Sequence, residues 1–434
     1  MNFSIAISVT YRIKNFCLFP QGNWPHFNST EAVNDNGEFT MIETRVYFSL
    51  ACLCALSVAN IYYNQPLLEL FSREFSADAK TVGSIAMVVQ LSYAAGLVFF
   101  VPLGDRVVRR RLLGILLGIN AVASLFAAMA QDIAQLLISN VAIGMTAVGA
   151  QIIIPMATLL APQEQRGRAV GIVMSGLMAG VLFARILSGT IGEHWGWRVM
   201  YIVAAAINVI MIVIIYRLLP HNCPSKNPMP YRQLIVSLLA YFRQESELRK
   251  ACLSGALMFG SFSALWGALA LLLSRPPYHF GSDIVGAFGF AGIAGILMTP
   301  IIGNLADRYT PQAIVILGSL CAIVGFLLLA MSGHYLTALI ISVIFLDVGG
   351  RAGLVGNQLR ALALSETARN RLNTVFMFCY FLGGALGTRI GAELSLRFGW
   401  FGIALLGVIT SLIVIFFNFK GMLSLFRRPS PPSL

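Results

Sequence analysis

The sequence predicts an all-α membrane protein with twelve transmembrane helices, arranged as two six-helix bundles related by pseudo-symmetry. Of its 434 residues, 57% are hydrophobic and only 11% are charged, whereas a soluble domain carries about a quarter charged residues. Long apolar windows recur along the chain, and each is long enough to cross a hydrocarbon core about 30 Å thick. Motifs of the first half also return in the second half.

The first half of the chain holds six long apolar windows, of which the fifth is interrupted by Arg185. These windows are 46–68, 81–104, 112–131, 133–163, 169–192 and 199–216. Because each is about 20 residues long or longer, each predicts one membrane-spanning helix. They define an N-terminal bundle over residues 41–220.

The second half repeats this arrangement after a polar linker at 221–250, which we expect to be a cytoplasmic loop. Its windows are 251–274, 284–306, 312–333, 335–359, 372–395 and 398–419. They predict a C-terminal bundle over residues 251–421, followed by a cytoplasmic tail at 422–434.

Residues 1–40 are polar and irregular, and Met41 stands just before the first window. The short apolar piece at 3–9 has no basic region before it, so it does not resemble a signal peptide. We expect this segment to be either a disordered leader or an artefact of the assigned start site.

The basic residues predict how the chain is oriented. The net charge of +12 could indicate nucleic-acid binding, but Lys and Arg lie at the ends of apolar windows rather than along one soluble face. If the loops alternate between the two sides, one side holds only Arg73, Lys80, Arg198, Arg275 and Arg397. By the positive-inside rule, the more basic side and both termini are cytoplasmic. We therefore expect a multi-pass protein of a bacterial cytoplasmic (inner) membrane that binds no nucleic acid.

An internal repeat relates the two halves. Several residues of the first half recur 203 positions later: Arg168, Gly180, Ala184 and Gly196-Trp197 align with Arg371, Gly383, Gly387 and Gly399-Trp400. Two parallel six-helix repeats are a transporter arrangement, and the substrate site is expected between them near the middle of the membrane.

Small residues recur every four positions on two predicted helices. The first series is Gly176, Gly180, Ala184, Ser188 and Gly192, and the second is Gly383, Gly387 and Gly391. Small residues at this spacing let helix backbones approach closely. The two stripes are either sliding surfaces used when the halves move or static packing surfaces.

Two charged hairpins lie between apolar windows at equivalent places in the halves. Both contain Leu-x-Asp-Arg, ending in Asp105-Arg106 in the first half and in Asp307-Arg308 in the second. A carboxylate at such a place can accept backbone N–H bonds at a helix terminus. Such contacts can break when two helices part; alternatively, the charges of these four residues only set the topology.

The first hairpin resembles the loop signature of the major facilitator superfamily, G-x-L-x-D-R-x-G-R-R. The matching residues are Leu103, Asp105, Arg106, Arg109 and Arg110, with Val101 and Val108 in place of the glycines. The resemblance covers about residues 42–421. Within the superfamily the chain is most similar to the drug:proton antiporter branch. The antiporter signature of the fifth helix is matched at Gly176, Gly180 and Gly189, although Ala184-Arg185 replaces Gly-Pro and Ser188 replaces a glycine. Asn140 replaces the arginine of the fourth-helix signature.

This resemblance implies a secondary transporter that works by alternating access. Its implied partners are a small-molecule substrate, protons and the lipid bilayer, and it is expected to act as a monomer. For Asp105 and Asp307, with Arg106 and Arg308, it implies a cytoplasmic gate. We expect no cofactor.

Ionisable residues inside a membrane are costly unless paired or hydrated, which makes them functional candidates. Asp347 lies at the centre of window 335–359, and Arg351 follows four residues later on the same helix face. The two are candidates for proton coupling. The alternative is a structural ion pair.

Arg185 and Arg389 are candidates for the substrate cavity. A guanidinium at the depth of Arg185 favours an anionic group through bidentate contact. Alternatively, Arg185 pairs with Asp347 or extends to the outer surface.

A polar cluster at the outer end of the first window adds three amide candidates for the cavity, Asn60, Asn64 and Gln65. Such amides could orient a polar solute. Alternatively, they form hydrogen bonds between helices.

The sequence contains no phosphate-binding loop, metal cluster, catalytic triad or redox motif, so we expect neither an enzyme nor a metal site. It predicts a secondary active transporter, with proton-coupled efflux of a drug or metabolite as the leading hypothesis. The alternatives are a proton symporter or uniporter that imports a nutrient, and a membrane protein that does not transport, either a sensor or a decayed copy.

Overall fold

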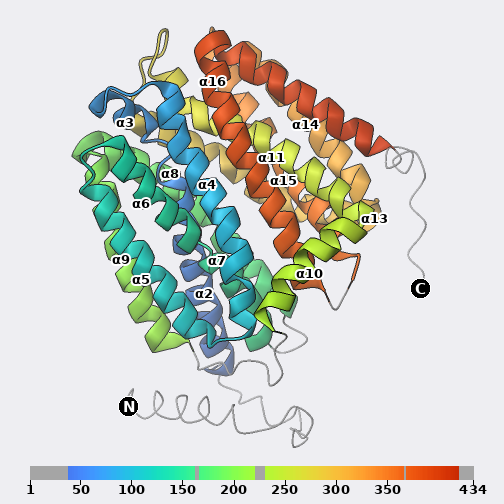
Figure 1. The fold of residues 1–434 in the computed structure, drawn as a ribbon. Coiled ribbons are helices and arrows are strands. Elements are labelled where there is room, and N and C mark those ends of the chain that lie inside the picture. Colours follow the sequence, from blue (N-terminus) through green and yellow to red (C-terminus); the bar gives the residue numbers. More distant parts are fainter. Residues whose placement is uncertain (1–37, 162–165, 220–229, 366–367, 420–434) are drawn as a thin grey trace, which may run out of the picture.

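The computed structural model describes residues 38–161, 166–219, 230–365 and 368–419, which form a bundle of helices. Figure 1 shows two groups of helices side by side, one drawn in blue to green and the other in yellow to red. Among the described residues, ten helices are long and apolar enough to span a membrane. A shorter apolar helix, Val46–Tyr62, supplies one more crossing. The last span divides into two, so the predicted all-helical architecture is confirmed.

The first half contains the crossings of the blue-to-green group (Figure 1). Its helices are α2 (Glu38–Tyr62), α3 (Leu68–Glu74), α4 (Ala79–Phe100), η1 (Pro102–Asp105), α5 (Arg109–Ala128), α6 (Ile133–Thr146), α7 (Gly149–Leu160), α8 (Arg166–Trp195) and α9 (Trp197–Leu218). Within this half α2 packs on α8, α4 on α6, and α5 on α9.

The second half follows after a short connecting helix, α10 (Tyr231–Gln244). Its helices are α11 (Ser246–Leu273), α12 (Ser282–Ala287), η3 (Phe288–Ala291), α13 (Gly292–Arg308), α14 (Pro311–Ala330), α15 (Leu336–Leu362) and α16 (Arg369–Phe417). Here α11 packs on α16, α13 on α15 and α14 on α16, so the second half repeats the pairings of the first.

The linker expected to be a loop contains a helix. In α10 the apolar residues Leu234, Leu238 and Tyr241 fall on one face, and Leu238 is buried. The Tyr231 hydroxyl donates to the Phe99 carbonyl at 2.9 Å, which joins α10 to the end of α4. A search for charge-free windows misses this helix, because its polar face carries arginines.

Three predicted spans differ from continuous helices. Helix α2 ends at Tyr62 rather than at residue 68, and Pro66 follows in the turn that leads to α3. The window at 133–163 is divided into α6 and α7 at Ala147 and Val148, and the window at 284–306 is divided by η3. Proline explains the first difference, because it lacks an N–H and restricts the residue before it.

The last two predicted spans run together as α16, which changes direction at Gly399. Gly399 has φ +56°, and its repeat partner Gly196 has φ +89° before α9. Positive φ values favour glycine because other residues would strain there. Helix α16 therefore consists of two spans, as the windows at 372–395 and 398–419 predict.

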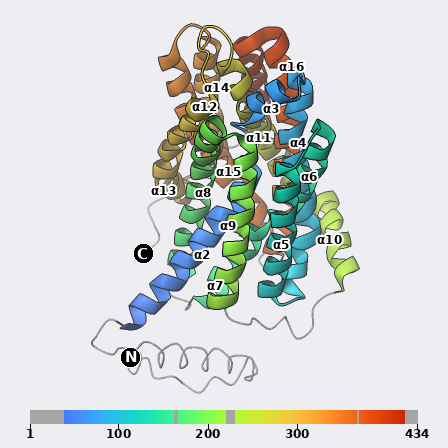
Figure 2. The same cartoon turned by 90° about the vertical axis from the view of Figure 1, so that its left-hand side faces the viewer.

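The ends of the molecule differ in charge. The hairpins that contain Arg109 and Arg308 lie at one end, which we call the basic end, and the α8–α9 turn lies at the opposite end. Helix α2 begins at Glu38, three residues before Met41, while the remainder of the expected leader (1–37) and the expected tail (422–434) fall outside the described residues. Figure 2 shows α2 and α9 side by side along the first half.

The two halves meet along two helix pairs. Helix α4 packs on α16, and α8 packs on α12 and η3. In the first pair Gln90 donates to the Thr388 hydroxyl at 2.9 Å, and the rings of Tyr93 and Phe381 lie 4.4 Å apart. The buried Arg185 lies at the second pair.

Candidate functional site

Helix α8 carries two residues that reach into the second half of the molecule. Met178 and Arg185 are seven residues apart, so they lie on the same helix face about 10 Å apart along the axis. Arg351 on α15 contacts the Met178 sulfur through Nη1. Around Arg185, α8 packs closely on α12 and η3. The backbones of α8 and α12 are so close that a Cβ added at Gly286 would meet the Arg185 carbonyl. The site therefore lies at the interface of the halves.

Arg185 is held by groups that carry no charge. Its side chain is buried, with the residue 4% exposed, and its Nε donates to Gln65 Oε1 at 2.9 Å. The guanidinium lies 3.6 Å from the ring centre of Trp266 and 5.1 Å from that of Tyr62. Aromatic faces attract cations, most strongly when the pair is desolvated. These contacts place Arg185 in the interior and not at the outer surface.

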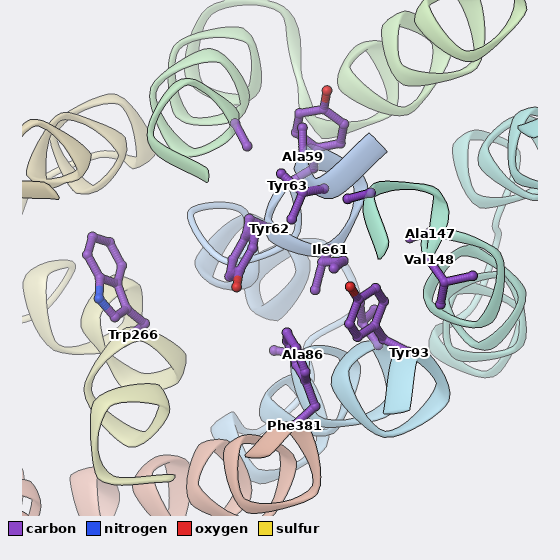
Figure 3. Packing of buried hydrophobic residues seen from close by; sticks show 14 of the residues in the cluster. Ala59, Ile61, Tyr62, Tyr63, Ala86, Tyr93, Ala147, Val148, Trp266 and Phe381 are labelled. Carbon is purple, nitrogen blue, oxygen red and sulfur yellow. The ribbon is translucent and has the colours of Figure 1, made fainter. Parts of the chain in front are cut away.

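Figure 3 shows Tyr62 and Trp266 on elements that face each other, with Tyr93 and Phe381 from α4 and α16 nearby. Trp266 comes from α11 in the second half, and Tyr62 is the last residue of α2 in the first. The guanidinium of Arg185 therefore contacts aromatic rings from both halves.

Asp347 and Arg351 form an ion pair, as their spacing on one helix predicts. Arg351 Nε lies 3.5 Å from Asp347 Oδ2, and the two side chains are 14% and 7% exposed. The carboxylate packs against α13, where a Cβ added at Gly295 would collide with Asp347 Oδ2. Glycine at position 295 thus makes room for the carboxylate.

The charges of this cluster are unbalanced. Asp347 offsets Arg351, but no Asp or Glu among the described residues lies within 4.0 Å of the Arg185 guanidinium. Burial of a charge without a partner is expensive. The central cluster, defined as Arg185, Arg351, Asp347, Gln65 and Trp266, therefore carries one net positive charge.

Several polar atoms near the cluster are buried without a hydrogen-bond partner. They include Asn64 Oδ1, Trp266 Nε1 and Asp347 Oδ2. Such atoms are uncommon in folded proteins, and each calls for an explanation such as a bound molecule.

Asn60 is not part of this cluster. Its Nδ2 donates to Asn208 Oδ1 at 3.3 Å, and Asn208 donates to Asn120 Oδ1 at 3.0 Å. Asn120 in turn donates to the Thr146 hydroxyl at 2.9 Å. These amides join α2, α9, α5 and α6, so the structure assigns Asn60 to hydrogen bonds between helices of the first half. The neighbouring Asn64 donates to the Ile61 carbonyl.

Arg389 also lies apart from the cluster. Its Nη1 donates to the Lys80 carbonyl at 2.6 Å, at the start of α4. This contact joins the two halves at the end opposite the basic end. The structure thus separates Arg389 from Arg185, although both were expected in the cavity.

The expected gate can be described only in part. The side chains of Asp105 and Asp307 are not among those that the structure describes. Of their neighbours, Arg106 is half-buried and Arg308 is exposed. Next to Asp105, Arg109 Nε donates to the Gly104 carbonyl at 3.0 Å, and Arg110 donates to the Leu219 carbonyl at 3.2 Å. These two arginines hold the hairpin to its own half.

The halves are joined at one end and separated by a hollow at the other. At the end opposite the basic end, Glu193 Oε2 accepts from the Ser282 N–H at 2.8 Å and lies 3.1 Å from its hydroxyl. At the basic end a crevice is lined by residues of both halves and of α10, among them Leu97, Gln151, Leu238, Asn373 and Met377.

Met178 contacts Arg351, and Trp266 and Tyr62 contact Arg185, although their positions in the sequence predict none of these contacts. A Met, a Trp or a Tyr in an apolar window carries no signal that separates it from ordinary packing residues. In the described ranges, no group of three His, Cys, Asp or Glu residues could hold a metal ion.

Comparison with known protein families gives one model that covers most of the chain. The model described as Major Facilitator Superfamily matches residues 50–388 and 251–434. The putative uncharacterized transporter YgaY of Escherichia coli (strain K12) is 36% identical over 366 residues, which cover 84% of this chain and 93% of that protein. The probable transporter SCO4007 of Streptomyces coelicolor is 32% identical, and the match covers 83% of this chain and 84% of that protein.

Solved structures share the fold at low sequence identity. A bacterial homolog of the human lysosomal transporter Spinster, in an inward-facing and unoccupied conformation, superimposes with a TM-score of 0.73 at 16% identity. The match covers 90% of this chain and 99% of that one. A peptide transporter, POT, gives a TM-score of 0.70 at 14% identity, with 87% and 95% covered.

Proposed function

The chain belongs to the major facilitator superfamily and is a multi-pass membrane transporter rather than an enzyme, and we propose that it moves a small solute by secondary active transport with alternating access. The observation that supports this most strongly is a buried cluster of ionisable residues where the halves meet. Two-repeat transporters place their substrate and coupling-ion sites at the repeat interface. Arg185 from the first half meets Trp266 from the second half there.

Proton coupling is assigned to Asp347 and Arg351. Asp347 is the buried carboxylate of the described spans, and its pairing with Arg351 lacks hydrogen-bond geometry at 3.5 Å. A carboxylate in such a place gains or loses a proton when its charged neighbour or its access to water changes. Movement of α8, which contacts Arg351 through Met178, provides that change.

We propose that the direction of solute transport is efflux from a bacterial cytoplasm. Protons that move into the cytoplasm drive this efflux. The support is the similarity of α8 to the helix-five signature of drug:proton antiporters, at Gly176, Gly180 and Gly189. The basic end is assigned to the cytoplasm by the positive-inside rule, so both termini are cytoplasmic. The transporter acts as a monomer in the inner membrane.

The conformation described corresponds in this proposal to a carrier open toward the cytoplasm. The contact of Glu193 with Ser282 closes the outer end, and the crevice beside α10 lies at the basic end. Asp105, Arg106, Asp307 and Arg308 form the cytoplasmic gate that closes in the opposite conformation. Their placement in hairpins at equivalent ends of the two halves supports this role.

The test of proton coupling uses Asp347→Asn in the full chain. A panel of drugs and metabolites is first screened for altered accumulation in cells that overexpress the protein, and the responding solute is followed in proteoliposomes. We expect Asp347→Asn to abolish accumulation driven by a pH gradient, because Asn keeps the shape and removes the titration. Exchange of labelled for unlabelled solute without a gradient should continue.

Asp78→Asn is the matched control. Asp78 caps α4 by accepting from the Thr81 N–H at 2.9 Å, and Asn caps helices about equally well. This variant should couple normally. Gradient-driven accumulation that persists in Asp347→Asn would show that the ion pair with Arg351 is only structural.

A further inference from the structure

The unpaired hydrogen-bond donors of the central cluster indicate what kind of group fits there. Arg185 uses Nε for Gln65, and neither terminal guanidinium nitrogen has a hydrogen-bond partner among the described residues. The indole N–H of Trp266, the ring that stacks on the guanidinium, is buried and also has no partner. A guanidinium fork is the protein group best matched to a carboxylate, because two parallel N–H bonds reach its two oxygens.

The charges limit the ligand to one negative charge. The charge of Arg351 is balanced by Asp347. The charge of Arg185 is not balanced, because no carboxylate of the described part of the chain lies within 4.0 Å of its guanidinium. A monoanion neutralises this charge. A dianion would bring a second negative charge toward Asp347, and a cation would face Arg185, so both are disfavoured.

The surroundings of Trp266 are apolar and aromatic. The ring of Phe262 lies 6.3 Å from Trp266 and 6.3 Å from Phe259, which stacks on Tyr380 at 4.0 Å. Phe262 also faces α15, because a Cβ added at Gly350 would lie 3.9 Å from it. A row of rings thus runs from the guanidinium toward the helix of Asp347. Aromatic rows of this kind bury flat apolar groups well.

We propose that the central cluster binds a small organic monoanion, with its carboxylate on Arg185 and Trp266 Nε1 and its apolar body along Phe262 and Phe259. Gln65 is a positioning residue, since it holds the guanidinium through Nε. This assignment names the substrate class of the proposed transporter and therefore depends on that function for its physiological meaning. Binding itself requires no transport and is tested without a gradient.

The test measures binding to the purified full chain in lipid nanodiscs by isothermal titration calorimetry. The probes are benzoate, phenylacetate and indole-3-acetate, each paired with its neutral amide, together with phthalate as a dianion and benzylamine as a cation. We expect at least one monocarboxylate to bind at least tenfold more tightly than its own amide, and phthalate and benzylamine to bind more weakly than that monocarboxylate. Equal binding of acids and amides, or no binding of any acid, would overturn the assignment.

Variants then locate the binding. Arg185→Gln should lower the affinity for the monocarboxylate at least tenfold and leave any weak amide binding unchanged. Arg185→Lys keeps the charge but loses the fork, so it should bind with intermediate affinity. Arg389→Gln is the control, because that arginine lies at the outer end on the Lys80 carbonyl. An undiminished affinity in Arg185→Gln, with Arg389→Gln weakened instead, contradicts the proposal.

The two proposals can fail independently. Carboxylate binding that depends on Arg185, without any solute flux in proteoliposomes, would retain the site and reject the transport function. Gradient-driven flux of a neutral or cationic solute, with no carboxylate binding, would retain transport and reject the anion site.

Discussion

Asn60 and Gln65 lie five residues apart near the end of the first span, yet the fold gives them different partners. The Asn60 amide joins a chain of amides through Asn208, whereas Gln65 reaches across to Arg185 on α8. Both side chains are buried, so exposure does not distinguish them. The two residues differ in their partners. The contact of Asn60 holds helices together, whereas the contact of Gln65 orients the guanidinium of Arg185.

This difference predicts opposite phenotypes for two alanine variants. Asn60→Ala leaves Asn208 with a buried amide that has lost a partner, and it should cost about 1–3 kcal/mol of unfolding free energy without changing ligand affinity. Gln65→Ala should lower the affinity for the monocarboxylate probe roughly tenfold with a smaller loss of stability. Thermal unfolding in nanodiscs and calorimetric titration measure the two effects. Asn60→Ala protein that folds normally but fails to bind would return Asn60 to the site.

At the scale of helices, glycines set how closely two symmetry-related pairs pack. A Cβ added at Gly180 on α8 would collide with the Ala55 carbonyl on α2. A Cβ added at Gly383 on α16 would collide with the Ala256 carbonyl on α11. The two glycines are repeat partners, so the same close contact is built once in each half. Direct backbone contact requires that neither position carries a side chain.

We therefore expect Gly383→Ala to destabilise the protein, by about 1–3 kcal/mol, as overpacking of a close contact does. Gly118→Ala on α5 is the control, because nothing lies within 4 Å of a Cβ added there. In a helix interior this control should gain about 0.5–1 kcal/mol from the better propensity of alanine. Unfolding midpoints of the two variants in the same lipid provide the measurement. Equal midpoints would show that α16 can shift on α11 without cost.

At the scale of the whole molecule, a contact between α8 and α12 helps to join the halves at the outer end. Glu193 on α8 accepts from the backbone N–H of Ser282 at 2.8 Å, and the Ser282 hydroxyl lies 3.0 Å from the Gly189 carbonyl. Since α12 belongs to the second half, these bonds must break before the outer end can open. The contact is therefore a candidate determinant of the balance between inward-open and outward-open states.

Glu193→Gln should shift this balance toward the outward-open state, because the amide accepts more weakly than a carboxylate. A loss of about 1 kcal/mol corresponds to a roughly fivefold change in population. Spin labels at Thr190 and Tyr335, two exposed positions on opposite halves, report the change as a larger fraction of long distances. Glu393→Gln is the control, since that carboxylate pairs with Arg397 at 2.9 Å within one helix. A distance distribution identical to that of the unsubstituted protein would rule out this role for Glu193.

The sequence by itself determined the features that depend on local order along the chain. Apolar windows predicted the spans, because a helix in lipid must satisfy its own backbone and present apolar side chains over its whole length. The spacing of Asp347 and Arg351 predicted their pairing, because residues four apart share a helix face. Repeated Gly-Trp pairs predicted the symmetry of the two halves. Apolar windows did not predict α10, because its arginines interrupt the apolar pattern.

Only the tertiary structure decided which distant residues meet. Arg185 was compatible with the cavity, with Asp347 or with the outer surface. Packing of α8 against α2, α12 and η3 leaves its side chain on Trp266 of α11 and on Gln65 of the turn after α2. Arg389, of the same residue type in an equally apolar helix, was placed on the Lys80 carbonyl instead. The physical reason is that the sequence of a membrane helix indicates the depth of each residue in the bilayer but not the rotation of the helix about its axis. That rotation is set by packing against neighbouring helices.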